Sequence, residues 1–262
     1  MMQALFDETQ EQLSRWKADP DVLGVIMVGS KSRGNGDALS DDDLEVILSD
    51  EAHARLHPTA CSVIRADEDG ALRKLIYDAY MTSISDLEGK AASPRDLDHW
   101  PYEGDVLLFD RDGRVGRAVA AAGAMPAEFR AARLRHGFVD VYLAAARAEK
   151  CLKRGFDAAA TLIVARGVKA LSRLIFALEG RWVPLDHWLE PELATLEDQA
   201  GAVPFLLEAL RTSRPGPLRE AMARLAERLE QEGLPPRSEF TAFFLEVIHQ
   251  DHAAERLIHG LT

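Results

Sequence analysis

Hydrophobic and polar positions follow two different patterns along the chain. In the first part, short apolar runs are separated by Gly, Asp and Pro, which predicts strands joined by turns. These runs lie at 23–29 (LGVIMVG), 44–48 (LEVIL), 61–84, which has the pattern of a hairpin, and 105–115. Ahead of them, apolar residues at helical spacing predict a helix over about residues 3–17 that the sequence ADPDV ends.

The pattern changes after the segment AGAMPAEF. Two long segments rich in Ala and Leu then repeat with helical spacing and end at Gly155 and Gly180, and two further amphipathic segments follow. Strand signals cease near Met125 and Pro126. The chain is therefore predicted to be an α/β (α+β) protein with two domains. Residues 1–125 form a small mixed sheet with helices packed on it, and residues 126–262 form an all-α helical bundle.

Composition excludes several classes of protein. With 47% hydrophobic and 28% charged residues, the chain has the composition of a folded globular protein. It contains no apolar run of membrane-spanning length, and its acidic N-terminus does not resemble a signal peptide, so we expect a cytoplasmic protein. A net charge of -12 argues against a broad nucleic-acid-binding surface and favours a cationic or metal-bound partner.

The stretch VGSKSRGNGDALSDDDLEVIL, residues 28–48, contains three successive aspartates at the start of a predicted strand. Adjacent carboxylates repel one another, and Asp is uncommon in strands, so this local conflict indicates a functional site. Side chains alternate along a strand, which places Asp41, Asp43 and Glu45 on one face and Asp42 on the other. Two carboxylates on one rigid face suit magnesium, whose remaining ligands are usually water and substrate phosphates.

The Gly-Ser pair that ends the preceding strand fits the same interpretation. Gly29 allows a tight turn, and the Ser30 hydroxyl together with nearby backbone amides can hold phosphate oxygens. Lys31 and Arg33 follow closely enough to contribute positive charge.

Gly-Ser at 29–30, nine intervening residues and SDDDLEV at 40–46 together resemble the signature of the nucleotidyltransferase superfamily, which shares the DNA polymerase β-type palm. The layout is also similar to that of bacterial aminoglycoside and lincosamide nucleotidyltransferases, in which a helical C-terminal domain closes over the palm and binds substrate. The segment FALEGRWVPLDHWL resembles part of such helical domains. One departure is Asp42, where the family usually has an apolar residue; we expect it to face away from the metals and to reach solvent.

The resemblance implies a set of site residues. The predicted nucleotide-binding residues are Gly29, Ser30, Lys31, Arg33 and Ser40, and Asp41 and Asp43 are predicted to bind two Mg²⁺ ions. A third carboxylate is expected from a neighbouring strand. Our prediction is Asp78, which interrupts the apolar run KLIYDAYMTSI. Nearby acids are weaker candidates, because Asp67, Glu68 and Asp69 belong to a predicted turn, and a helix cap is expected at Ser85 or Asp86.

The implied activity is transfer of a nucleoside monophosphate, most simply AMP from ATP, to a hydroxyl of a small and cationic acceptor, with release of pyrophosphate. Asp140 or Glu149 on the first long helix could act as general base. Two alternatives remain open, a nucleotidyltransferase that modifies or regulates proteins and a catalytically idle nucleotide-binding module. The sequence leaves the oligomeric state open.

Overall fold

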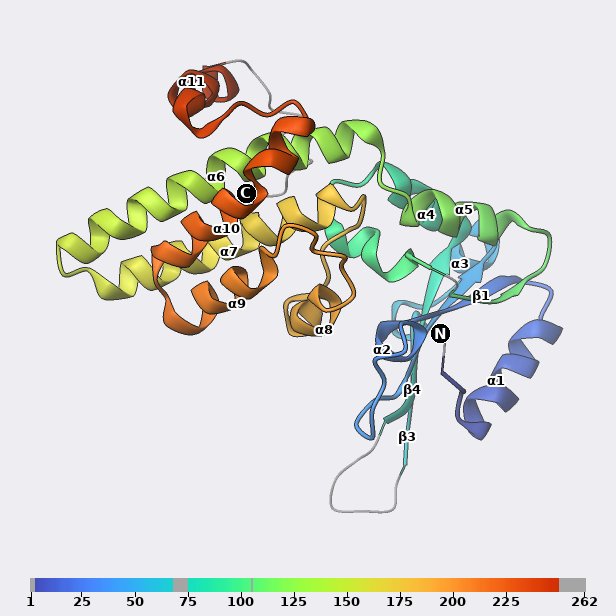
Figure 1. Ribbon diagram of the computed structural model, residues 1–262. Coiled ribbons are helices and arrows are strands. Elements are labelled where there is room, and N and C mark those ends of the chain that lie inside the picture. Colours follow the sequence, from blue (N-terminus) through green and yellow to red (C-terminus); the bar gives the residue numbers. More distant parts are fainter. Residues whose placement is uncertain (1–2, 68–74, 105, 250–262) are drawn as a thin grey trace. The chain divides into compact units, whose positions relative to one another are not determined.

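The computed structural model describes residues 3–67, 75–104 and 106–249. The chain divides into two compact units. One comprises Met1–Ser93 and Leu97–Ala124, and the other comprises Pro94–Asp96 and Met125–Thr262 (Figure 1). Among the described residues, no helix combines the length and apolar character that a membrane crossing requires.

The first unit is built on a mixed five-stranded sheet, as predicted. Its strands are β1 (Val22–Val28), β2 (Asp42–Leu48), β3 (Ser62–Ala66), β4 (Leu75–Ser83) and β5 (Leu107–Asp110), in the order β3-β4-β2-β1-β5. Strand β1 runs antiparallel to β2 and β5, and β3 runs antiparallel to β4, as the hairpin pattern predicted. Strands β2 and β4 are parallel, and this pairing is not evident from the sequence.

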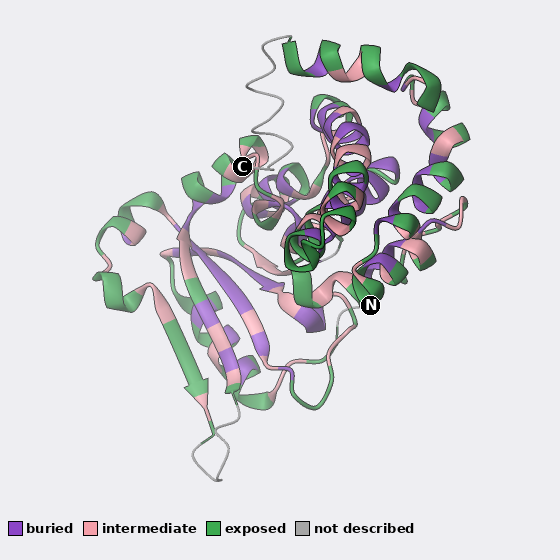
Figure 2. Ribbon diagram, turned by 90° about the vertical axis from the view of Figure 1, so that its left-hand side faces the viewer, coloured by how far each residue is buried: buried purple, intermediate pink, exposed green. Residues whose placement is uncertain are grey.

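Each face of the sheet packs against different helices. The helices of this unit are α1 (Asp7–Ala18), α2 (Gly29–Ser32), α3 (Asp50–Ala54), α4 (Ile84–Gly89) and α5 (Arg114–Gly123). Helix α1 inserts Leu13 and Trp16 into a core with Leu44, Val46 and Tyr77 on one face. On the other face, residues of α4 and α5 pack with side chains of β1 and β2. This second core contains no residue of β3 or β4, and Figure 2 shows the contrast between exposed β3 and the buried central strands.

The cap of α4 differs from the prediction. Ser83, rather than Ser85 or Asp86, is the N-cap, and its hydroxyl accepts the Asp86 backbone N–H at 3.0 Å and donates to the Asp86 carboxylate at 2.7 Å. Ser85 instead binds the Asp50 carboxylate through its backbone N–H and its hydroxyl. The Ser83 hydroxyl thus satisfies the backbone N–H of Asp86, one of the N–H groups that the first turn leaves without helical partners.

The described residues of the second unit form helices joined by turns. They are α6 (Ala127–Lys153), α7 (Asp157–Leu178), α8 (Leu189–Leu193), α9 (Val203–Thr212), α10 (Pro215–Gln231) and α11 (Phe240–His249), with short 3-10 turns between some of them. Helices α6 and α7 approach closely where Gly167 meets Ala144, since an added Cβ would lie 2.8 Å from the Ala144 Cβ. Gly155 and Gly180 follow α6 and α7 with φ values of +74° and +67°, which explains why glycine ends each helix.

The segment Pro94–Asp96 belongs to the helical unit although residues on both sides of it belong to the sheet unit. Asp96 accepts one contact from Arg133 and one from Arg173, each at 3.1 Å. Arg133 is almost fully buried, so the carboxylate compensates a charge that burial would otherwise penalise.

Candidate active site

Asp42 is fully buried, and its carboxylate is bound by other residues of the protein. It is the first residue of β2, is 0% exposed, and binds the Lys31 Nζ at 2.8 Å through one carboxylate oxygen and the Phe6 backbone N–H at 2.9 Å through the other. The Lys31 Nζ also lies 3.5 Å from the centre of the Phe6 ring. Asp42 faces away from Asp43, as alternation predicted. The expectation that it reaches solvent is wrong, because Lys31 and the residue before α1 cover it.

Asp43 occupies the space beside Gly29. Gly29 has a φ of +70°, and a Cβ added to it would lie 1.9 Å from the Asp43 Oδ2. The position therefore requires glycine for two reasons, the left-handed backbone and the close approach of the Asp43 carboxylate. The Gly-Ser turn and the strand that carries the aspartates are thus in direct contact.

Asp78 lies next to Asp43 in the sheet. The parallel register of β2 and β4 pairs these two residues, while the antiparallel register of β1 and β2 pairs Asp43 with Val28. Paired residues point to the same face, so both carboxylates project from one side. Asp41 immediately precedes β2 and is close enough to affect the pKa of both residues. The structure therefore brings the three predicted aspartates Asp41, Asp43 and Asp78 together.

The other acids considered for this role lie elsewhere. Asp67 is exposed after the end of β3, and Asp86 lies in the first turn of α4, where it binds Ser83. Glu68 and Asp69 lie outside the described residues.

Burial and the mutual proximity of the carboxylates raise the pKa values of Asp43 and Asp78. Burial, followed by the charges of Asp41 and Asp78, raises the pKa of Asp43 from 3.8 to about 7. Asp42 raises it further, and Lys31 lowers it. Burial and then the charge of Asp41 raise the pKa of Asp78. Such a group of repelling carboxylates is stabilised by a cation.

The aspartates fit a magnesium site as a pair. Within the described part of the chain, no group of three or more His, Cys, Asp or Glu side chains is arranged to hold a metal ion. Magnesium, however, usually takes only one or two protein carboxylates and completes its shell with water and phosphate oxygens. The Asp78 Oδ1 is buried and has no hydrogen-bond partner among the described residues, although a buried carboxylate oxygen normally has one. Asp43 and Asp78 thus supply the charge and a vacant oxygen that such an ion requires.

Ser30 and Ser40 connect the two halves of the motif. The Ser30 Oγ donates to the Ser40 Oγ at 3.0 Å, and the Ser40 hydroxyl in turn contacts the Asp37 carboxylate at 3.2 Å and accepts its backbone N–H at 2.9 Å. A serine hydroxyl has a single proton to donate. In this arrangement the Ser30 hydroxyl holds the loop between β1 and β2. Backbone N–H groups of the Gly29 turn are therefore better candidates than the Ser30 hydroxyl to donate hydrogen bonds to a phosphate.

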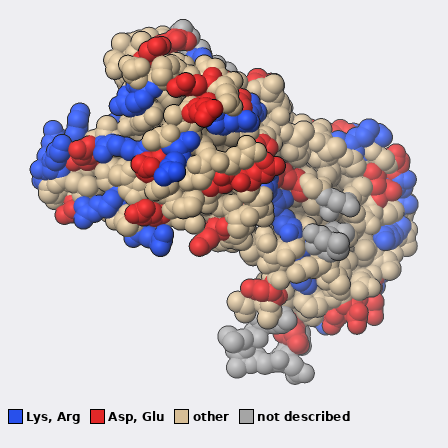
Figure 3. Space-filling view, in the orientation of Figure 1, with Lys and Arg blue, Asp and Glu red and all other residues tan. Residues whose placement is uncertain are grey.

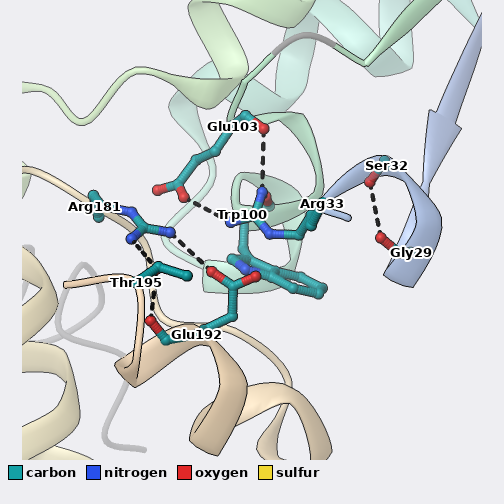
Figure 4. A network of polar contacts seen from close by, with 8 residues as sticks. All are labelled: Gly29, Ser32, Arg33, Trp100, Glu103, Arg181, Glu192 and Thr195. Carbon is teal, nitrogen blue, oxygen red and sulfur yellow. Dashed lines mark hydrogen bonds and ion pairs between the residues drawn. The ribbon is translucent and has the colours of Figure 1, made fainter. Parts of the chain in front are cut away.

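Lys31 and Arg33 are both engaged with the protein. Lys31 pairs with Asp42, and Arg33 donates to the Glu103 carboxylate at 2.9 Å and to the carbonyl oxygens of Glu103 and Trp100 at 3.1 and 3.3 Å (Figure 4). The guanidinium also lies 4.8 Å from the Trp100 ring centre. Their described contacts order the loop, so we do not include them among the proposed phosphate contacts.

A buried polar cluster on the same sheet face was not predicted. Glu45, two residues after Asp43, accepts the Lys90 Nζ at 2.8 Å and the Tyr102 hydroxyl, and Lys90 also contacts that hydroxyl. Burial and the Glu45 charge raise the pKa of Tyr102. The cluster compensates Glu45 entirely within the protein, which distinguishes it from Asp43 and Asp78. The sequence did contain a signal for this cluster, because the acid Glu45 in the apolar run LEVIL requires a partner when buried. Which residue is that partner depends on the fold.

The two predicted general bases lie on α6. Asp140 is half-buried. Glu149 is bound by Lys153 and Arg219, and their hydrogen bonds, that of Lys153 first, hold its pKa below the usual value. A carboxylate with a lowered pKa is a weaker base, so these contacts do not favour Glu149 in that role.

On the face visible in Figure 3, Lys and Arg side chains lie among Asp and Glu side chains over the helical unit.

Comparison with known proteins gives limited similarity. Residues 100–189, about a third of the chain, match a family described as a domain of unknown function, DUF4037. No curated protein matches the chain. A solved structure, a nucleotidyltransferase-like protein from Exiguobacterium sibiricum, is 18% identical, with 92% of this chain and 79% of that chain covered and a TM-score of 0.42. A score this low does not establish a common fold, so the residues themselves carry the functional argument.

Proposed function

We propose that this chain is a magnesium-dependent nucleotidyltransferase that transfers a nucleoside monophosphate, most simply AMP from ATP, to a hydroxyl of a small molecule. The observation that supports this most directly is the pairing of Asp43 with Asp78 on neighbouring parallel strands, with Gly29 packed against the Asp43 carboxylate. A strand-borne acidic pair beside a glycine turn offers one place for a cation and an adjacent place for phosphates.

In this reaction the oxygen of the acceptor hydroxyl forms a bond to the α-phosphorus. The bond from that phosphorus to the bridging oxygen breaks, pyrophosphate leaves with the electron pair, and the hydroxyl proton passes to a carboxylate base. Asp41, Asp43 and Asp78 would hold one or two magnesium ions, and the backbone at Gly29 and Ser30 would hold the triphosphate. Bound magnesium supplies positive charge that stabilises the phosphoryl oxygens and lowers the pKa of the attacking hydroxyl.

The acceptor is proposed to be small and cationic, because carboxylates dominate the site and the whole chain is acidic. The sequence resemblance points to molecules of the aminoglycoside or lincosamide type.

The test is incubation with magnesium and α-³²P-labelled ATP, GTP, CTP or UTP, each with a panel of aminoglycosides, lincosamides and polyols. We expect pyrophosphate release together with label in a small product. Label on a polypeptide would instead support a protein-modifying enzyme, and a complete lack of pyrophosphate would support an idle binding module.

Two variants connect the activity to the site. Asp43→Asn and Asp78→Asn keep the side-chain shape and remove a ligand charge, so turnover should fall at least a hundredfold, which corresponds to about 2.7 kcal/mol of transition-state stabilisation. Asp86→Asn is the matched control in the same unit and should retain turnover. Loss of turnover in Asp86→Asn with a normal Asp78→Asn would contradict the assignment.

A further inference from the structure

The paired strands place four residues in one row across the sheet. Ile64 on β3 pairs with Asp78 on β4, Asp78 pairs with Asp43 on β2, and Asp43 pairs with Val28 on β1. We call these four residues the aspartate row. Neighbouring strands are roughly 5 Å apart, so the row extends in regular steps from the Gly29 turn at the β1 end to Ile64 at the β3 edge.

The β3 end of the row exposes large apolar side chains. Ile64 is 63% exposed, and Tyr80, two residues after Asp78 on β4, is 58% exposed. Tyr80 pairs with Ser62 on β3, so Tyr80 and Ile64 are diagonal neighbours on the face that carries Asp78. Long and aromatic side chains in diagonal positions are within reach of each other, so together they form an apolar surface beside the acidic pair.

In-line displacement decides which substrate lies at this end. The attacking oxygen and the leaving pyrophosphate must lie on opposite sides of the α-phosphorus. Under the proposed function, the backbone of the Gly29 turn at β1 holds the triphosphate. The hydroxyl must then approach across Asp43 and Asp78 from the opposite direction, which is the side of β4 and β3.

We propose that Tyr80 and Ile64 form the acceptor platform of the enzyme and select an alcohol whose hydroxyl is carried on a ring with an apolar face. This inference rests on the proposed function. A ring laid on Tyr80 and Ile64 removes apolar surface from water and places its hydroxyl beside the carboxylates of Asp43 and Asp78. An acyclic acceptor with the same polar groups lacks the apolar contact.

A pair of probes separates the apolar contact of the ring from the contacts of the polar groups. 2-Deoxystreptamine carries amines and hydroxyls on a saturated ring, and 1,3-diamino-2-propanol carries a hydroxyl flanked by two amines without a ring. We expect the ring probe to bind about tenfold more tightly, a difference equivalent to about 1.4 kcal/mol.

The binding experiment requires no turnover. The chain contains four tyrosines, so protein with ¹³C-labelled tyrosine rings gives four sets of ring signals, and Tyr80→Phe identifies those of Tyr80. In metal-free protein, the ring probe should shift the Tyr80 signals at concentrations where the acyclic probe does not. Unchanged Tyr80 signals, or equal shifts with both probes, would overturn the proposal.

The kinetic experiment uses the same probes as acceptors. Tyr80→Ala and Ile64→Ala should each reduce the ratio of kcat/KM for the ring probe to that for the acyclic probe, by about tenfold for Tyr80→Ala, the factor that corresponds to about 1.4 kcal/mol. Val63→Ala is the matched control, because Val63 neighbours Ile64 on β3, is 36% exposed and points to the opposite face. An equal change in Val63→Ala would count against the platform.

The two proposals can fail separately. If wild-type protein releases no pyrophosphate with any nucleotide and acceptor, the proposed transferase activity is wrong, and the tyrosine signals still decide whether the surface binds a ring. If pyrophosphate is released but the ring and acyclic probes react equally in wild type and in Tyr80→Ala, the activity stands and the platform is wrong.

Discussion

Replacement of Gly29 by alanine tests the contact that joins the glycine turn to the acidic strand. Two costs are expected. An alanine at a φ of +70° adopts the left-handed conformation at a cost of roughly 1–2 kcal/mol. Its Cβ would also lie 1.9 Å from the Asp43 Oδ2, so the carboxylate must leave its rotamer, at a cost on the order of 0.5–1.5 kcal/mol. Gly29→Ala should therefore destabilise the sheet unit by about 2–3 kcal/mol.

A double-mutant cycle isolates the second cost. In an Asp43→Ala background the carboxylate is absent, and the Cβ of residue 43, 3.0 Å from the added methyl, remains. Gly29→Ala should then cost roughly 1–2 kcal/mol, which leaves a coupling energy of about 1 kcal/mol. Gly104→Ala in the same unit is the control for backbone strain alone. Gly104 has a φ of +90°, and apart from its chain neighbours no described residue lies within 4 Å of an added Cβ.

The measurement is amide hydrogen exchange of peptides from β1 and β2 in chelator, which reports the free energy of opening of this part of the structure without requiring the two units to unfold together. Equal costs of Gly29→Ala with and without the Asp43 carboxylate, or a cost no greater than that of Gly104→Ala, would show that the carboxylate does not require glycine at position 29.

Three further predictions concern the buried polar residues Asp42, Asp43 and Tyr102. Asp42→Ala leaves the Lys31 ammonium buried without its partner and should destabilise the protein by roughly 3–5 kcal/mol in urea denaturation, whereas the double variant Asp42→Leu with Lys31→Met should recover most of that loss. Because the folded pKa of Asp43 lies above its ordinary value of 3.8, metal-free protein should lose stability as pH rises from about 4 through about 7. Asp43→Asn should reduce the stability lost over this pH range, measured by thermal unfolding in chelator, by about 2 kcal/mol after allowance for solvent screening. An unchanged loss would contradict the raised pKa of Asp43. Tyr102→Phe removes a hydroxyl that donates to buried Glu45 and should lower stability by about 1.5–3 kcal/mol by urea denaturation; a neutral effect would show that Glu45 does not depend on it.

Local patterns in the sequence predicted much of the fold. Short apolar runs and turn residues located the strands, and glycines after periodic segments located the ends of α6 and α7. The conflict between three aspartates and a strand marked the candidate site, and the interruption of an apolar run singled out Asp78. These features depend on interactions between residues close in the chain, which a linear pattern records.

Pairing between distant segments was decided by the tertiary structure alone. The parallel register of β2 and β4 sets Asp78 beside Asp43, and packing of the N-terminal segment on β2 turns Asp42 and Lys31 into a buried ion pair. Sequence patterns show that a buried acid needs a partner, but not which cation reaches it, because that choice depends on which elements pack together. For the same reason, only the assembled sheet shows that one face carries the two carboxylates next to exposed Tyr80, since pairing across strands sets that arrangement.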